Sequence, residues 1–294
     1  MKTFLFILLH FILYYGRVIK YNGFTFKENE GNKMKKMFLI ISVLMLSVAL
    51  VACNSNLTDL EYIEDKGTFV LGYTDFPPMG FLENGEPSGF DIEIAKLVFE
   101  RMGVELRFRY IDWDAKVVEL DSKRIDAIWN GLTITDERKL EMTFSNPYFD
   151  NNLIIISKEG SGIDTIADLN DKNIGVELGS SADLSTSKNE EIMDLSKEIK
   201  KYSTSSDAIL ALNAGLVDAV IVDEIYARYV VMKDTNNTYE IGSEIIGQEQ
   251  YGVGFRLGDE SLRDKIDQIL DDLYEEGLIQ PISIKYFGVN LFIR

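Results

Sequence analysis

A few polar side chains that follow short apolar runs are the residues best suited to chemistry in this sequence. Arg138 closes the stretch DAIWNGLTITDER (Asp126–Arg138), and Asp223 directly follows the apolar run Leu216–Val222. A guanidinium binds a carboxylate through paired hydrogen bonds, and a carboxylate binds an ammonium group. Gly179-Ser180-Ser181 adds backbone and hydroxyl donors where a helix is expected to begin. An anion site beside a cation site predicts binding of the zwitterionic head of a free amino acid.

The position of Arg138 supports this interpretation. Thr135-Asp136-Glu137 has the composition of a helix start, with a capping hydroxyl followed by two acids. A cation at the next position opposes the helix dipole, and a local rule broken at the mouth of a strand indicates a functional site. A bound carboxylate would remove the conflict, because free N–H groups near Thr133 and the guanidinium of Arg138 would both contact it.

Phe76 and Trp113 provide flat apolar faces that are suited to the side chain of such a solute. Each candidate also has a purely structural interpretation. Arg138 could form a surface ion pair with Glu141, which would contribute little to stability. The other structural interpretations are core packing for Trp113, helix caps for Ser180-Ser181 and Asp223, and solvated loop acids for Asp75 and Glu177. Four of these residues fall at strand ends, and this shared position favours a common site.

The elements that must position these residues alternate between strands and helices. Expected strands are Thr68–Thr74, Val104–Ile111, Asp126–Trp129, Asn152–Ser157, Asn173–Leu178, Leu216–Val222 and Tyr251–Arg256. Expected helices are Asp91–Met102, Trp113–Lys123, Ser205–Gly215, Asp223–Met232 and Ser261–Glu276. This alternation predicts an α/β fold with mixed, mostly parallel sheets covered on both faces.

A weak internal repeat divides the chain into two similar units. Leu120-Asp121 followed by Ile125–Ile128 matches Leu212-Asn213 followed by Val217–Val220 at identical spacing. Two α/β units predict two lobes with a cleft between them. Ligands of open α/β sheets bind outside the carboxyl ends of strands, so both strand ends should face that cleft.

The first 52 residues have the composition of a leader. Phe38–Ala52 is an apolar run behind Lys33, Lys35 and Lys36, too short for a comfortable membrane span and typical of a signal peptide. The small residue before Cys53 resembles a lipoprotein processing site, which predicts lipidation of Cys53; a plain secretory signal is the alternative. Residues 1–33 are then surplus, and we interpret them as a misannotated extension upstream of Met34.

The composition excludes several classes of function. The leader holds seven basic and two acidic residues of the chain's 30 and 48, so the remainder carries 23 basic and 46 acidic residues, a net charge of −23. Such an acidic surface argues against nucleic acid as a partner. The single histidine, His10, lies in the leader, and Cys53 is the single cysteine. We therefore expect no catalytic residue based on Cys or His, no metal site and no cofactor.

Several motifs together resemble the bacterial extracellular solute-binding proteins of family 3, the polar amino-acid receptors of ABC importers. These are GFDIEIAKLVFE (Gly89–Glu100), the loop FPPMGF, WDAK, DAIWNGLTITDERK and VDAVIVDE. The resemblance runs from about Gly67 to Phe287 and implies a two-lobed periplasmic-binding-protein (Venus flytrap) fold with a hinge. Phe99 stands where the family usually has a smaller residue, which concerns packing.

The resemblance also implies roles for individual residues. Arg138 would pair with the α-carboxylate of the solute, assisted by Thr133 and Ser180-Ser181, and Asp223 would bind the α-ammonium. The remaining ligand-binding residues would be Phe76 and Trp113 beside the side chain, with Asp75, Asn130, Gly131 and Glu177 around them. Glu177 stands where relatives often have an apolar or amide residue, and a buried acid there favours a cationic side chain such as that of arginine or lysine.

The expected organisation follows from these points. A signal peptide (34–52) precedes a tether (53–66), lobe 1 combines 67–150 with 250–294, and lobe 2 spans 151–249. The chain should cross between lobes near Asp150–Asn152 and Gly247–Gly252, and solute binding should close the hinge.

The expected function is that of an extracytoplasmic, lipid-anchored, monomeric receptor that delivers a polar amino acid to an ABC permease. Because no Walker-type glycine loop occurs in the chain, a separate ATPase would be required. The alternatives are an enzyme on the same fold, such as a dehydratase of a small carboxylated ring with Glu177 and Asp75 as acid and base, and a ligand-sensing subunit.

Overall fold

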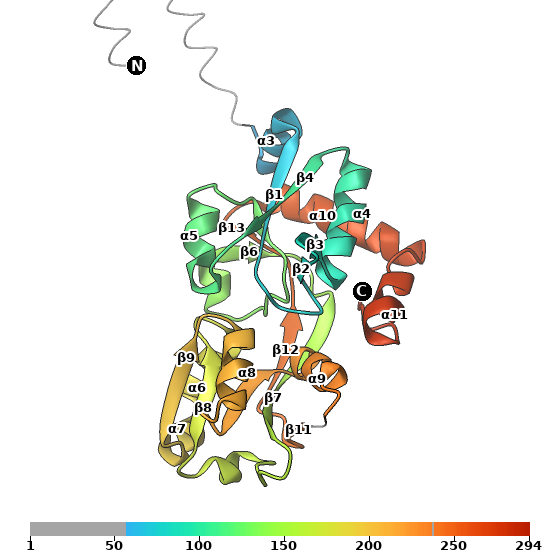
Figure 1. The fold of residues 1–294 in the computed structure, drawn as a ribbon. Coiled ribbons are helices and arrows are strands. Elements are labelled where there is room, and N and C mark those ends of the chain that lie inside the picture. Colours follow the sequence, from blue (N-terminus) through green and yellow to red (C-terminus); the bar gives the residue numbers. More distant parts are fainter. Residues whose placement is uncertain (1–56, 237) are drawn as a thin grey trace, which may run out of the picture. The chain divides into compact units, whose positions relative to one another are not determined.

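The computed structural model describes residues 57–294 with the exception of residue 237. Residues 57–294 form one compact unit that contains two large β-sheets and the helices packed on them (Figure 1). The predicted leader and Cys53 lie outside the described residues. Within the described part of the chain, the search for a long apolar helix of membrane-spanning type finds no candidate.

The first sheet has the strand order β4-β1-β5-β13-β6. Its strands are β1 (Thr68–Tyr73), β4 (Glu105–Tyr110), β5 (Ala127–Ile128), β6 (Met142–Phe144) and β13 (Gly254–Arg256). β1 pairs in parallel with β4 and β5, whereas β13 is antiparallel to β5 and β6. Its accompanying helices are α4 (Phe90–Met102), α5 (Lys116–Asp121), α10 (Glu260–Glu275) and α11 (Gln280–Phe287), and a small hairpin joins β2 (Phe81–Glu83) to β3 (Glu86–Ser88). α10 forms because its apolar residues recur at helical spacing and bury Leu262, Ile266, Ile269, Leu270 and Leu273.

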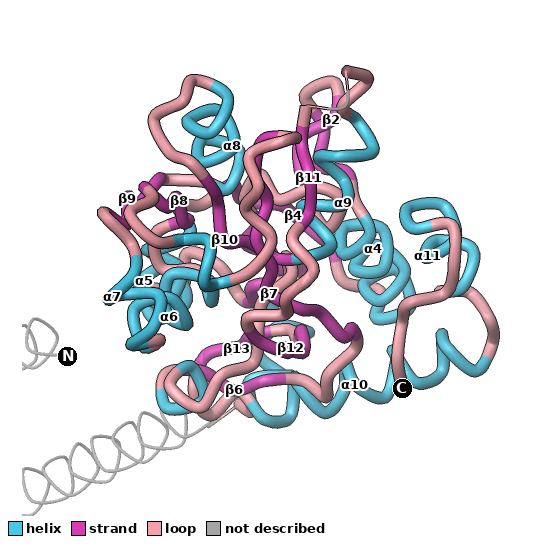
Figure 2. The backbone as a smooth tube through the Cα atoms, turned by 90° about the horizontal axis from the view of Figure 1, so that it is seen from below, coloured by secondary structure: helices cyan, strands magenta, loops and turns pink. Residues whose placement is uncertain are grey.

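The second sheet has the strand order β11-β7-β10-β8-β9, with β12 also paired to β7. Its strands are β7 (Phe149–Lys158), β8 (Asn173–Glu177), β9 (Glu198–Tyr202), β10 (Ala219–Asp223), β11 (Tyr239–Ile241) and β12 (Gly247–Tyr251). Its helices are α6 (Ser181–Lys188), α7 (Glu190–Leu195), α8 (Ser205–Asn213) and α9 (Glu224–Lys233), with a short 3-10 helix, η3 (Ile166–Leu169). In Figure 2, α8 lies on one side of β8 and β10 and α6 lies on the other. β10 is buried at every position, as its uninterrupted apolar sequence predicts for a strand covered on both faces.

Two segments connect the sheets. The chain leaves the first sheet after β6 and enters the second at β7, and it returns between β12 and β13. β7 and β12 run side by side as an antiparallel pair, from Phe149 opposite Tyr251 to Leu153 opposite Gly247 (Figure 1). The rings of Phe149 and Tyr251 stack with centroids 5.5 Å apart, which ties the two connections together.

The two-lobed α/β fold is confirmed, but the sheets are mixed rather than mostly parallel. Within the two large sheets of the described region, the parallel pairs are β1–β4, β1–β5, β8–β9 and β8–β10, and the antiparallel pairs are β7–β10, β7–β11, β7–β12, β5–β13 and β6–β13. The antiparallel pairs arise because both connections between the lobes enter the sheets in reverse direction. The residue limits of the lobes, 67–150 with 250–294 and 151–249, remain a prediction.

Two local expectations differ from the structure. The predicted tether 53–66 overlaps helix α3 (Asp59–Lys66), which begins with a capping box between Thr58 and Glu61. α3 is held against α10, because Asp59 accepts hydrogen bonds from Ser261 and from the backbone N–H of Leu262. The α-helix expected after Thr135 is a single 3-10 turn, η2 (Arg138–Leu140), although Thr135 does accept a hydrogen bond from the N–H of Arg138, at 3.2 Å.

Candidate functional site

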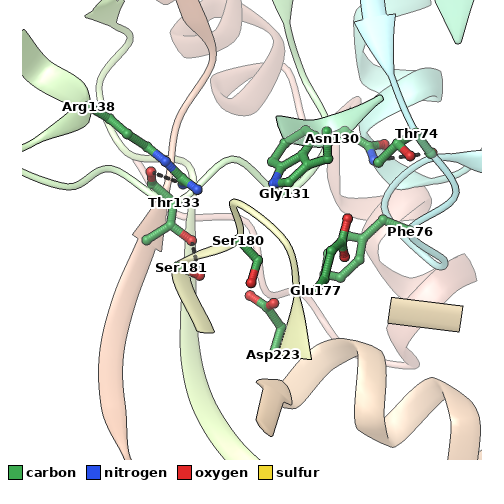
Figure 3. Close-up of a pocket in the computed structure, with 11 residues that line it drawn as sticks. Thr74, Phe76, Asn130, Gly131, Thr133, Arg138, Glu177, Ser180, Ser181 and Asp223 are labelled. Atoms are coloured by element: carbon green, nitrogen blue, oxygen red, sulfur yellow. Dashed lines mark hydrogen bonds between the residues drawn. The ribbon is translucent and has the colours of Figure 1, made fainter. Parts of the chain in front are cut away.

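Strand ends from both sheets meet at one cavity, which contains about 290 Å³ of space between atoms and is partly open to solvent (Figure 3). The residues that line the cavity are Thr74, Phe76, Trp113, Asn130, Gly131, Thr133, Arg138, Glu177, Ser180, Ser181 and Asp223. The cavity is thus lined by ten of the eleven residues that we predicted from the sequence. Asp75 is the exception, because its neighbour Thr74 lines the cavity in its place.

The local sequence explains how these side chains reach the cavity. Asn130 and Gly131 follow β5, Ser180 and Ser181 follow β8, and Asp223 ends β10, so each group leaves a buried strand at its carboxyl end. Gly131 has φ +61°, and a Cβ atom there would lie 2.8 Å from a ring carbon of Phe76. Glycine therefore lets the backbone approach the aromatic ring that lines the cavity.

Arg138 is the buried cation of the cavity, with 7% of its surface exposed. Its guanidinium donates to the carbonyl of Thr133 at 2.8 Å (Figure 3) and to the carbonyl of Gly179 at 3.1 Å, so it contacts both lobes. Burial lowers the pKa of Arg138, while the charges of Glu249 and Asp223 oppose that shift. These contacts make the surface ion pair with Glu141 the weaker interpretation, because a surface ion pair does not need a buried guanidinium.

Asp223 is the buried acid at the opposite wall. Its Oδ1 accepts hydrogen bonds from Asn151 at 2.7 Å and from the hydroxyl of Tyr251 at 2.5 Å. Burial, together with the nearby charge of Glu249, raises the pKa of Asp223 to about 8. The side chain does not cap α9, because the cap position shows no side-chain hydrogen bond. A cation that binds beside a buried carboxylic acid lowers the pKa of that acid and so favours its ionised form.

Glu177 is a second buried acid, and a buried lysine lies near it. Glu177 accepts from the N–H and the hydroxyl of Ser205, at 3.0 and 2.6 Å. Burial raises the pKa of Glu177 to about 7, and the charge of Lys116 partly opposes the shift. Lys116 donates to the carbonyls of Trp113 and Gly179, both at 3.0 Å, and burial lowers the pKa of Lys116 to about 7. This lysine therefore supports the wall of the cavity and bridges the two lobes.

The aromatic faces lie as their sequence positions suggest. Phe76 and Trp113 line the cavity, and the ring of Phe76 stacks on that of Tyr226 with centroids 5.4 Å apart. Asp75 points to another contact, because it accepts a hydrogen bond from Ser206 at 3.1 Å, and Ser206 also contacts the hydroxyl of Tyr226. Ser180 caps α6 by accepting a hydrogen bond from the N–H of Asp183 at 3.0 Å, which confirms the helix-cap interpretation for this residue. Ser180 also lines the cavity.

Sequence reasoning missed Thr74, Lys116, Tyr226 and Glu249. Lys116 is part of the quoted motif WDAK, but no local sequence pattern indicated that its side chain is buried. Glu249 lies on β12, and its carboxylate accepts from Thr133 at 3.0 Å and from Ser181 at 3.1 Å. Glu249 stands in the polar run Gln248-Glu249-Gln250, which suggests a solvated acid, so no sequence signal identified it. Among the described residues, no group of three or more His, Cys, Asp or Glu side chains is arranged to hold a metal ion.

The raised carboxyl pKa values predict how stability depends on pH. Burial raises the pKa of Asp91 and of Glu177 to about 7, and burial with the charge of Glu249 raises that of Asp223 to about 8. Between pH 5 and 7 the folded protein binds more protons at these groups than the unfolded chain does. Its free energy of unfolding should therefore fall as pH rises, by up to about 1.4 kcal/mol per pH unit for each carboxyl. Thermal melts without solute should give a higher Tm at pH 5.5 than at pH 7; a lower Tm at pH 5.5 would contradict this assignment.

Comparison with known proteins relates this geometry to a family. Residues 70–289 match the model of the bacterial extracellular solute-binding proteins, family 3. The L-cystine-binding protein TcyJ of Escherichia coli (strain K12) is 32% identical over 256 residues, which covers 84% of this chain and 94% of that protein. A solved structure described as Tv2483 bound to L-arginine is similar with a TM-score of 0.76 and 34% identity, covering 80% of this chain and 96% of that one. A substrate-binding protein of an ABC uptake transporter from Streptococcus pneumoniae, with bound histidine, has a TM-score of 0.77 and 34% identity over 80% of this chain and 98% of that one.

Proposed function

The chain belongs to the bacterial extracellular solute-binding proteins of family 3 and is a solute-binding receptor, and on that premise we propose that its solute is a free amino acid with a cationic side chain. The observation that carries the proposal is one cavity that contains a buried guanidinium, Arg138, and a buried acid, Asp223, from different lobes. The guanidinium binds the α-carboxylate, and the acid binds the α-ammonium. Thr133, Ser180 and Ser181 assist at the carboxylate, and Phe76 and Trp113 flank the side chain.

The balance of charge around the cavity supports a cationic side chain. The α-carboxylate accounts for the charge of Arg138 and the α-ammonium for that of Asp223, which leaves Glu177 as the acid of the cavity wall without a counterpart on the solute's head group. Burial raises the pKa of Glu177. A buried excess of negative charge is costly unless a cation accompanies it. An amino acid with a cationic side chain supplies a second cation for Glu177, whereas a neutral zwitterion does not. The similar structure with bound L-arginine, at 34% identity, is consistent with this choice.

Transport by this receptor requires partners outside the chain. It closes around the solute by bending at the paired connections β7 and β12 and delivers the solute to an ABC permease that a separate ATPase drives. Cys53 carries the lipid that holds the monomeric receptor at the outer face of the membrane. Members of this family are binding proteins, and we propose that this chain is a binding protein and not an enzyme. Glu177 and Asp75 do not form the acid–base pair that an enzyme would need, because Glu177 is hydrogen-bonded to Ser205 and Asp75 to Ser206.

A thermal-shift screen of the twenty amino acids tests the proposal. A solute that binds only the folded protein raises its stability by about 2.7 kcal/mol at a hundredfold excess over Kd. Arginine and lysine should give the largest increases in Tm, and calorimetry should then give one site per chain. If no amino acid raises Tm, the proposed function is wrong; if glutamine or glutamate exceeds arginine and lysine, the cationic assignment is wrong.

Glu177→Gln should change the choice of solute without removing the site. The glutamine side chain keeps an oxygen that can accept from Ser205, but it removes the negative charge that a cationic side chain needs. We expect the Kd for arginine to rise about tenfold or more while the Kd for glutamine stays the same or falls, since a charge-assisted hydrogen bond contributes about 1.5–3 kcal/mol. Calorimetry with both amino acids measures the change. Asp207→Asn, which neutralises an exposed acid near Glu177, is the matched control and should leave both Kd values within about twofold. An unchanged Kd for arginine in Glu177→Gln would remove Glu177 from recognition.

A further inference from the structure

Glu249 is a half-buried acid that the proposed recognition of the solute does not use. Its Oε2 accepts from the hydroxyl of Thr133 at 3.0 Å, from the hydroxyl of Ser181 at 3.1 Å and from the amide of Asn151 at 3.3 Å. Thr133 follows β5 of the first sheet, whereas Ser181 begins α6 on the second. One carboxylate oxygen on the connecting strand β12 therefore holds a hydroxyl from each lobe.

These two hydroxyls are the ones placed beside Arg138 at the anion end of the cavity. Thr133 and Ser181 lie 3.2 Å apart, oxygen to oxygen, and both line the cavity (Figure 3). A hydroxyl has a single proton to donate. While those protons point at Glu249, neither hydroxyl can donate to a second carboxylate, and a solute carboxylate would also meet the negative charge of Glu249 at close range.

We propose that Glu249 is a surrogate for the solute's α-carboxylate: without solute it bridges Thr133 and Ser181 and favours the closed cleft, and the solute's carboxylate displaces it from both hydroxyls. The proposal rests on the proposed function for the identity of the displacing group, and on the contacts of Glu249 alone for the bridge. It makes Glu249 a residue that determines how much the α-carboxylate contributes to affinity.

The surroundings of Glu249 give the displaced side chain a place to go. Glu249 also lines a second, more open cavity, together with Lys139, Gln248 and Gln250 and with the acid Asp150. These polar groups and solvent can receive a carboxylate that has left the two hydroxyls. The charge of Arg138, which stabilises ionised Glu249 in the absence of solute, is then available to the solute's own carboxylate.

The first test compares arginine with argininamide, which lacks the α-carboxylate, in the wild-type protein and in Glu249→Gln. Any effect of the substitution on the hinge changes both Kd values equally, so it cancels in their ratio. Competition between Glu249 and the α-carboxylate affects only arginine, so it does not cancel. The ratio of the Kd for argininamide to the Kd for arginine should be larger in Glu249→Gln by about tenfold or more. Asp150→Asn neutralises an exposed acid on the adjoining strand β7, hydrogen-bonded to Gln250 at 2.9 Å, and should leave the ratio unchanged.

The second test measures closure without any solute. Spin labels on Asp121→Cys in α5 and Met193→Cys in α7, both exposed and on different lobes, report the distance between lobes in a chain that also carries Cys53→Ser. Glu249→Gln should shift the unliganded distance distribution toward longer distances, and Asp150→Asn should not. An unchanged Kd ratio would overturn the competition, and an unchanged distribution would overturn the bridge. If arginine does not bind the wild-type protein at all, the proposed solute is wrong, and the distance measurement still decides whether Glu249 bridges the lobes.

Discussion

Arg138→Ala is expected to abolish measurable solute binding while leaving the fold intact. The substitution removes the buried guanidinium that lines the cavity, and with it the two charge-assisted hydrogen bonds that we propose it donates to the α-carboxylate. At roughly 1.5–3 kcal/mol for each bond, the loss is about 3–6 kcal/mol, or about a hundredfold to more than a ten-thousandfold increase in Kd. Calorimetry with arginine measures the change.

The controls for Arg138→Ala separate recognition from folding. Arg138→Lys keeps a cation but loses the planar fork, so it should recover only part of the affinity. Arg124→Ala removes an exposed arginine paired with Glu119 at 2.8 Å and should bind like the wild type. Circular dichroism should be the same for all three variants, because the carbonyls of Thr133 and Gly179 that lose Arg138 can be hydrated in an open cleft. A Kd for Arg138→Ala within a few-fold of the wild type would exclude this residue from the anion site.

The candidate site was largely accessible from sequence because its residues sit where strands end. Asn130, Glu177 and Asp223 each follow or end a run of buried apolar residues, and the carboxyl ends of such strands gather at one edge of an α/β sheet. The misfit of Arg138 at an apparent helix start gave a further signal. The structure around Arg138 differs from the predicted helix start, because only one 3-10 turn forms there and the guanidinium contacts carbonyls from both lobes.

The residues that sequence reasoning missed act across the two lobes. The polar run Gln248-Glu249-Gln250 suggests that Glu249 is an exposed acid. The antiparallel pairing of β12 with β7 brings it near Asn151 and the hydroxyls of Thr133 and Ser181. Lys116 is buried, and one of its two carbonyl acceptors belongs to Gly179 of the other lobe. Contacts of this kind depend on how the lobes approach each other, and no local pattern in the sequence records that.

The same distinction applies to the fold. Helix α10 and strand β10 follow directly from periodicity and from an unbroken apolar run. The direction of the strands does not, because β13 enters the first sheet antiparallel after a long excursion through the second. Helix α3 had a local signal, the capping box of Thr58 and Glu61, that a prediction of a tether overlooked.

Asp223→Asn should weaken binding about a hundredfold or more and remove most of the dependence of affinity on pH. In the unliganded protein the pKa of Asp223 is raised to about 8, so at pH 7 this group is mostly protonated. An ammonium binds the ionised form, so binding must release a proton. Affinity of the wild type should therefore fall as pH decreases from 8 to 6, by up to tenfold per unit from this group. Calorimetry in buffers of different ionisation enthalpy counts the protons released.

The Asp223→Asn variant isolates the charge of this side chain from its packing. The introduced asparagine keeps an oxygen that can accept from Tyr251, so the wall of the cavity should persist, but it cannot ionise to meet the ammonium. The number of protons released at pH 7 should then fall, leaving the smaller contribution of Glu177, whose pKa is raised to about 7. Asp218→Asn changes an acid at the other end of the same strand, where it accepts from the N–H of Asn173, and should leave both affinity and proton release unchanged. Wild-type affinity that stays constant from pH 8 to 6, or an Asp223→Asn variant that releases as many protons as the wild type, would show that the ammonium binds elsewhere.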